Sequence, residues 1–108
     1  MEDEVISPVA QKRLEEIHRL SQAYNGRDAK DHAQQLLRLM KEHIEEIEDL
    51  ALADDPHHLV ETGDLLILCC EWLIEHRSSV DEMMQRCFKR YEKKLQGLLE
   101  SQESRLGE

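Results

Sequence analysis

Residues 43–74 read HIEEIEDLALADDPHHLVETGDLLILCCEWLI. An acidic cluster comes first, a break follows at Asp54-Asp55-Pro56, and the last part is the most apolar segment of the chain. At about 100° per residue, an α-helix places five polar residues of this region within one narrow stripe: His57, Glu61, Asp64, Glu71 and Glu75. A helix that is apolar on its other sides is buried on most sides. We therefore expect the stripe to face the preceding helix or an interior groove.

Upstream of this region, two helices are marked by their ends. Ser7-Pro8 predicts a helix start, with serine as the N-cap and proline at the first helical position. Asn25-Gly26 predicts the end of that helix. Asp28 or Asp31 can cap the second helix, which the break at residues 54–56 ends.

Downstream, the same break starts a third helix, and Ser78-Ser79 ends it. Ser79-Val-Asp-Glu82 is a capping box for a fourth helix, whose apolar residues recur at spacings of three and four. No segment alternates between polar and apolar residues as a strand does. The pattern predicts an all-α fold, a four-helix bundle.

Composition limits the class of protein. A chain of 108 residues suffices for one domain, and we expect a helical core over about residues 7–100 with a frayed tail at 101–108. The formal charge of −10 argues against nucleic-acid or membrane partners. Three cysteines without a framework spacing, expected as buried thiols, and an N-terminus unlike a signal peptide predict a cytoplasmic protein.

The third helix is too apolar for one chain of this size to cover, so we expect a homo-oligomer, a dimer or a tetramer. Two carboxylate pairs, Glu42 with Glu45 and Glu61 with Asp64, are each spaced by three residues and so share a helix face. A short loop makes the two helices antiparallel neighbours, so the pairs can converge. Oxygen ligands in this number suit Mg²⁺, with Mn²⁺ as an alternative.

From about Leu36 to Lys94 the chain resembles the MazG-like family of all-α nucleoside triphosphate pyrophosphohydrolases. The resemblance is carried by Lys41-Glu42-His-Ile-Glu45, by Glu61-Thr-Gly-Asp64-Leu-Leu-Ile, and by a last helix with a basic-aromatic ending at residues 89–94. It implies a metal-dependent enzyme that hydrolyses a nucleoside triphosphate to the monophosphate and pyrophosphate, in nucleotide-pool house-cleaning. The implied metal ligands are Glu42, Glu45, Glu61 and Asp64.

The chain departs from the family motif at Lys41, where a glutamate is usual. An alternative register, Glu45-Glu46-Ile-Glu-Asp49, restores the double glutamate and stays open. Glu45 or Glu46 is the candidate general base, and His57 and Asp49 are candidate neighbours of the ligands. A basic run of four residues could meet the substrate's phosphates: Lys89, Arg90, Lys93 and Lys94.

Three other interpretations of the sequence are possible. The related phosphoribosyl-ATP pyrophosphohydrolase uses a similar bundle, but its usual Glu-Glu and its Ala-Ala-Asp ending are not seen here. A non-catalytic helical interaction module would leave the acidic faces as solvated surface. The six histidines do not predict zinc, because no Cys or His partners lie at zinc-ligand spacing, and Glu15-Glu-Ile-His18 is a single Glu-x-x-His. Base and sugar preference have no sequence signal.

Overall fold

The computed structural model describes residues 4–25 and 29–107. Within these residues the chain is all-helical, without a strand, which confirms the predicted class. The four helices are α1 (Pro8–Asn25), α2 (Ala29–Leu52), α3 (His58–Glu75) and α4 (Val80–Leu106).

Two predicted helix starts are confirmed by their capping bonds. The Ala10 amide donates to Ser7 Oγ at 3.1 Å in the first turn of α1. The Glu82 amide donates to Ser79 Oγ at 3.2 Å, and Ser79 is the N-cap of α4. Each bond satisfies one of the amide donors that a helix start leaves open. Asp31 lies in the first turn of α2, whereas Gly26 and Asp28 lie outside the described residues.

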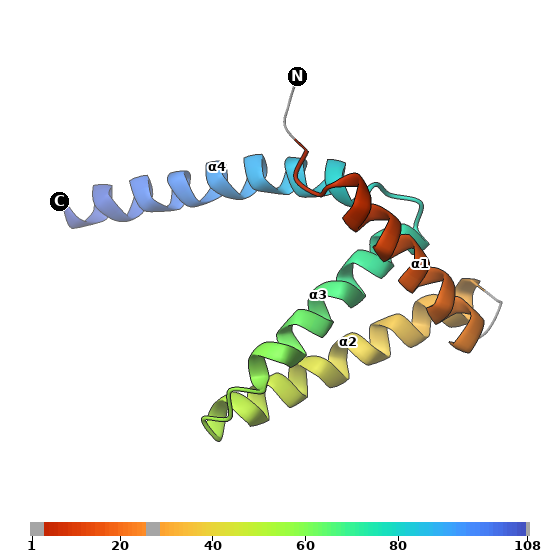
Figure 1. The fold of residues 1–108 in the computed structure, drawn as a ribbon. Coiled ribbons are helices and arrows are strands. Elements are labelled where there is room, and N and C mark those ends of the chain that lie inside the picture. The colour runs from red at the N-terminus through yellow and green to blue at the C-terminus, as the bar shows by residue number, and fades with distance from the viewer. Residues whose placement is uncertain (1–3, 26–28, 108) are drawn as a thin grey trace.

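Helices α2 and α3 form a long antiparallel hairpin, and α1 lies across the end where α2 begins and α3 ends (Figure 1). α4 leaves this three-helix junction and extends away from the hairpin (Figure 1). The described chain is correspondingly elongated, with principal extents of 58 × 45 × 25 Å. The single chain therefore does not close into a bundle of four helices.

The apolar core lies near this junction. Leu14, Cys70 and Val80 are buried together, one from each of α1, α3 and α4. Leu36 of α2 is fully buried further along the hairpin. The position of the core agrees with the sequence pattern, because α3 is the most apolar helix and contacts all three others.

α4 is anchored only by its first turns. Val80 is fully buried, whereas every residue from 88 to 107 is exposed. α4 continues to Leu106, beyond residue 100 where we expected the helical core to end. The predicted fray is therefore not seen up to that point, and residue 108 lies outside the described residues.

The cysteines differ in part from expectation. Cys70 is buried and Cys87 half-buried, but Cys69 is exposed, because adjacent residues on a helix point in different directions. All three are free thiols. Among the described helices, none combines the length and apolarity that crossing a bilayer requires.

Candidate functional site

The predicted carboxylate pair of α3 meets a histidine of α2. Glu61 and Asp64 lie one turn apart on α3, and His43 lies opposite them on α2. One ligand atom from each of the three residues lies within 4.8 Å of the other two. We call these residues the hairpin cluster. Its existence confirms that this part of the acidic stripe faces α2.

The Glu61 carboxylate lies between two imidazoles. His43 Nε2 is 3.4 Å from Glu61 Oε2, and His57 Nε2 is 3.3 Å from Glu61 Oε1. The Glu61 side chain is 13% exposed and that of His43 is 21% exposed, whereas Asp64 is exposed. His43 Nδ1 lies 2.8 Å from the carbonyl oxygen of Leu39, to which it donates if protonated, which leaves Nε2 directed at Glu61. In the hairpin cluster, the Glu61 carboxylate is thus positioned by two histidines, and the Asp64 carboxylate beside it faces solvent.

The acidic residues of α2 are all exposed, and they lie at different angles from His43. Glu45 is two residues from His43, so helical geometry places it on nearly the opposite side of α2. Glu46 is three residues from His43 and therefore lies on an adjacent side. None of Glu42, Glu45, Glu46 and Asp49 is part of the hairpin cluster, or of any other potential metal-binding group that the described residues form.

The basic run on α4 lies apart from the hairpin cluster within one chain, because α4 extends away from the α2–α3 hairpin (Figure 1). Lys89, Arg90 and Lys93 line a groove of about 530 Å³. Lys94 Nζ lies 5.7 Å from the centre of the Tyr91 ring, within the range of cation–π attraction.

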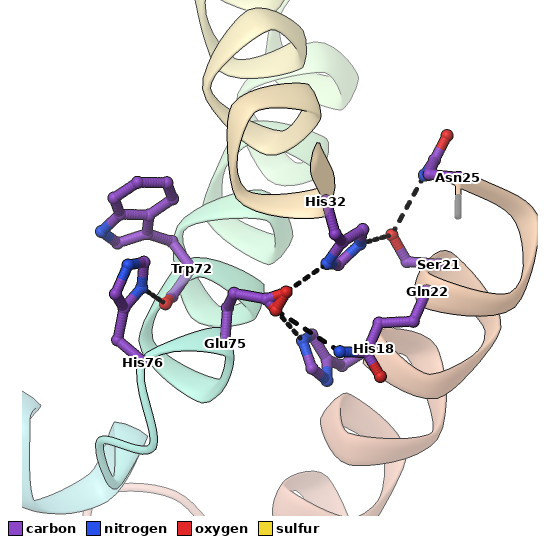
Figure 2. Close-up of polar contacts among 8 residues, drawn as sticks. All are labelled: His18, Ser21, Gln22, Asn25, His32, Trp72, Glu75 and His76. Carbon is purple, nitrogen blue, oxygen red and sulfur yellow. Dashed lines mark hydrogen bonds and ion pairs between the residues drawn. The ribbon is translucent and has the colours of Figure 1, made fainter. Parts of the chain in front are cut away.

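A second cluster, which the sequence did not predict, lies at the three-helix junction. His18 of α1, His32 of α2 and Glu75 of α3 converge there (Figure 2). His32 Nδ1 is 2.6 Å from Glu75 Oε1, and His18 Nε2 is 3.3 Å from Glu75 Oε2. The side chains are 0%, 11% and 3% exposed for His32, His18 and Glu75. We call these three residues the junction cluster.

Polar neighbours surround the junction cluster. His32 Nε2 lies 2.9 Å from Ser21 Oγ, and the Gln22 side-chain amide donates to Glu75 Oε2 at 3.4 Å (Figure 2). Burial by itself would raise the pKa of Glu75, but the hydrogen bonds and charge interactions with His32 and His18 outweigh it and lower that pKa. Glu75 is therefore held as a carboxylate inside the protein.

Part of the junction cluster had a sequence signal. Glu71 and Glu75 belong to the acidic stripe, and its prediction that they face inward is confirmed by their buried side chains. His18 stood in the single Glu-x-x-His, whose partner was missing. His32 had no signal, because its role depends on where α1 crosses the hairpin.

Comparisons with protein-family profiles, with curated proteins and with solved structures found no match to this chain.

Proposed function

We propose that the protein is a MazG-like, Mg²⁺-dependent nucleoside triphosphate pyrophosphohydrolase that works as a homo-oligomer. The observation that carries the proposal is the hairpin cluster, where Glu61, on an apolar helix, is half-buried against α2 and Asp64 is exposed beside it. A carboxylate is rarely buried to this extent unless a partner or a cation compensates its charge. The sequence motif that carries the family resemblance contains the same two residues.

The donor set fits a hard divalent cation. Glu61 and Asp64 supply carboxylate oxygens, and the exposure of Asp64 leaves room for the waters that Mg²⁺ retains. When bound, Mg²⁺ neutralises triphosphate charge and makes a coordinated water more acidic. His43 and His57 hold Glu61 in place and orient its two oxygens.

Of the two open registers on α2, helical geometry favours the second. Glu46 lies on the side of α2 next to His43, whereas Glu45 lies on nearly the opposite side. Glu42 and Asp49 are seven residues apart and share a face between these two directions, so they do not separate the registers. We therefore assign Glu46 as the general base and further carboxylate of the site, with Asp49 as its neighbour. In the first register, Glu45 would have to act from the side of α2 that faces away from His43.

The basic residues of α4 complete the site in an oligomer. Lys89, Arg90 and Lys93 lie on a helix that leaves its own hairpin, so they reach a triphosphate at the hairpin cluster of a second chain rather than their own. A local cationic surface of this kind offsets the formal charge of −10 for an anionic substrate.

The test is turnover of a panel of ribo- and deoxynucleoside triphosphates with Mg²⁺ and with EDTA, with products resolved by anion exchange. We expect monophosphate and pyrophosphate only with Mg²⁺. Asp64→Asn and Glu46→Gln should lower kcat/KM by about 100-fold or more, because each removes charge that holds metal or proton. Glu48→Gln, an exposed glutamate of the same helix, is the matched control and should be neutral.

Other outcomes contradict the proposal in distinct ways. Loss of activity in Glu45→Gln with Glu46→Gln unaffected would reinstate the first register. Turnover of phosphoribosyl-ATP alone would assign the related enzyme. If no nucleotide is hydrolysed and Mg²⁺ does not bind, the helices serve as an interaction module.

A further inference from the structure

The junction cluster has the arrangement of a metal site distinct from the hairpin cluster. Its three potential ligand atoms come from three different helices and lie within 4.8 Å of one another. His18 Nε2 and Glu75 Oε2 are 3.3 Å apart. A tetrahedral cation with bonds of about 2.0–2.1 Å spaces its ligands by roughly 3.4 Å. The pair therefore already has the separation that such a cation requires.

A second carboxylate beside the cluster has one oxygen atom without a hydrogen-bond partner. Glu71 lies one turn before Glu75 on α3 and is 4% exposed. Its buried Oε1 has no hydrogen-bond partner among residues 4–25 and 29–107. A buried polar atom in this state carries a desolvation cost that nothing in the described protein offsets.

Glu71 lies within electrostatic range of the junction cluster, although it is not among the three residues whose ligand atoms lie within 4.8 Å of one another. Burial raises the pKa of its carboxyl, while the Ser21 hydroxyl and the nearby His32 and His18 act in the opposite direction and Glu75 adds to the rise. Glu71 is therefore close enough for its charge to interact with the two histidines and the glutamate of the cluster. A cation bound among them would give the unpartnered oxygen a ligand role.

We propose that His18, His32, Glu75 and Glu71 bind a divalent transition-metal cation of the zinc class at the three-helix junction. Two imidazole nitrogens with carboxylate oxygens suit Zn²⁺ rather than the all-oxygen preference of Mg²⁺. The ion ties α1 to the α2–α3 hairpin and so stabilises the fold. It is separate from the cation of the proposed enzymatic site.

The surrounding residues have the positions of an outer ligand shell. With His32 Nδ1 directed at the cation, Nε2–H donates to Ser21 Oγ, 2.9 Å away. The Asn25 amide donates to the same Ser21 oxygen at 3.4 Å (Figure 2). Such bonds fix the tautomer and the ring plane of a ligand histidine. The 2.6 Å contact between His32 Nδ1 and Glu75 Oε1 lengthens by roughly 1 Å when the ion enters.

The first experiment measures Zn²⁺ binding to untagged, chelator-stripped protein by competition with a chromophoric chelator. We expect each chain to bind one equivalent of Zn²⁺ with high affinity. His32→Gln should lower this affinity by about 100-fold or more, and Glu71→Gln should lower it by at least about tenfold. His43→Gln is the matched control, since His43 belongs to the hairpin cluster. Zinc affinity lost in His43→Gln and kept in His32→Gln would overturn the proposal.

A second measurement uses the wild-type protein, because His32 is fully buried and its replacement can disturb folding. Imidazole ¹H–¹⁵N spectra are recorded during a Zn²⁺ titration, and Co²⁺ is added to a separate sample. We expect the ring signals of His18 and His32 to shift together, and the visible absorption bands of tetrahedral Co²⁺ to appear. Saturation with zinc while these two rings stay unchanged, or Co²⁺ absorption of octahedral type only, would contradict the site.

Discussion

Acidic residues on the most apolar helix of this chain find different partners along its length. At the start of α3, Glu61 lies between His43 and His57, whereas at its end Glu75 lies between His32 and His18. In each case the imidazoles offset part of the cost of burying a carboxylate. One stripe on one helix therefore supplies both candidate metal sites of the protein.

A further carboxylate fastens the N-terminal segment. Asp81 Oδ1 accepts hydrogen bonds from the amides of Val5 and Ile6 at 2.6 and 2.7 Å, and Oδ2 accepts from the side chain of Gln85 at 2.8 Å. The Ile6 and Val5 amides and the Gln85 amide lower the pKa of Asp81, although its desolvation acts in the opposite direction.

This pKa shift predicts a pH-dependent attachment of residues 5 and 6. A carboxyl whose pKa is lowered in the folded state contributes stability above its ordinary pKa and loses it as the pH falls through the lowered value. We expect the amide proton shifts of Val5 and Ile6 to titrate below the usual aspartate range in NMR spectra. In Asp81→Asn this titration should vanish, and a titration that persists would assign it to another acid.

At the scale of the elements, two helices end in the same motif. At the end of α3 the Arg77 amide donates to the Ile74 carbonyl, and the Ser78 amide donates to the Leu73 carbonyl, both at 2.9 Å. This is the Schellman pattern, which needs a left-handed residue where Arg77 has φ 58°. α2 ends likewise at Asp54, with φ 55°.

The strained residue gives a stability prediction. An L-residue in this conformation costs on the order of 1 kcal/mol, a cost that glycine does not carry. We expect Arg77→Gly to be more stable than Arg77→Ala by about 1 kcal/mol in denaturant unfolding. The alanine variant is the control because it removes the same charge and keeps the Cβ. Equal stability of the two variants would mean that the backbone conformation is not the source of strain.

At the scale of the whole molecule, α4 is a long helix whose residues 88–107 are all exposed among the residues that the structure describes. Four large apolar residues at spacings of three and four form one face of it, and each is at least half exposed: Phe88, Tyr91, Leu95 and Leu98. An apolar face of this length on a helix indicates a packing surface. The proposed homo-oligomer would cover it.

Oligomerisation is tested by the solution mass. Sedimentation equilibrium should give at least twice the chain mass of 12.7 kDa. Phe88→Glu, which places a charge on this face, should weaken association by at least about 30-fold. Gln96→Glu adds the same charge on another face of α4 and should leave the mass unchanged. If the wild-type protein is a monomer at all concentrations, the proposal that α4 of one chain contributes to the site of a second chain is wrong.

The helices of this protein could be predicted from the sequence because their signals are local. Each signal involves only residues close together in the chain: a serine cap, a proline at a break, or a periodic apolar stripe. The start of α4, with Ser79 as its N-cap, is an example. The grouping of polar residues of α3 into one stripe is equally local, since it depends only on 100° per residue.

Tertiary structure decided how the helices are combined. His32 meets Glu75 through the packing of α2 against α3, and His18 joins them because α1 crosses the end of the hairpin; no spacing along the chain records either contact (Figure 2). The rotation of α2 about its axis, set by packing against α3, decides that His43 and not Glu42 or Glu45 faces Glu61. The sequence alone therefore determined the elements and their polar faces. The contacts between distant segments depend on packing geometry, which is a property of the whole fold.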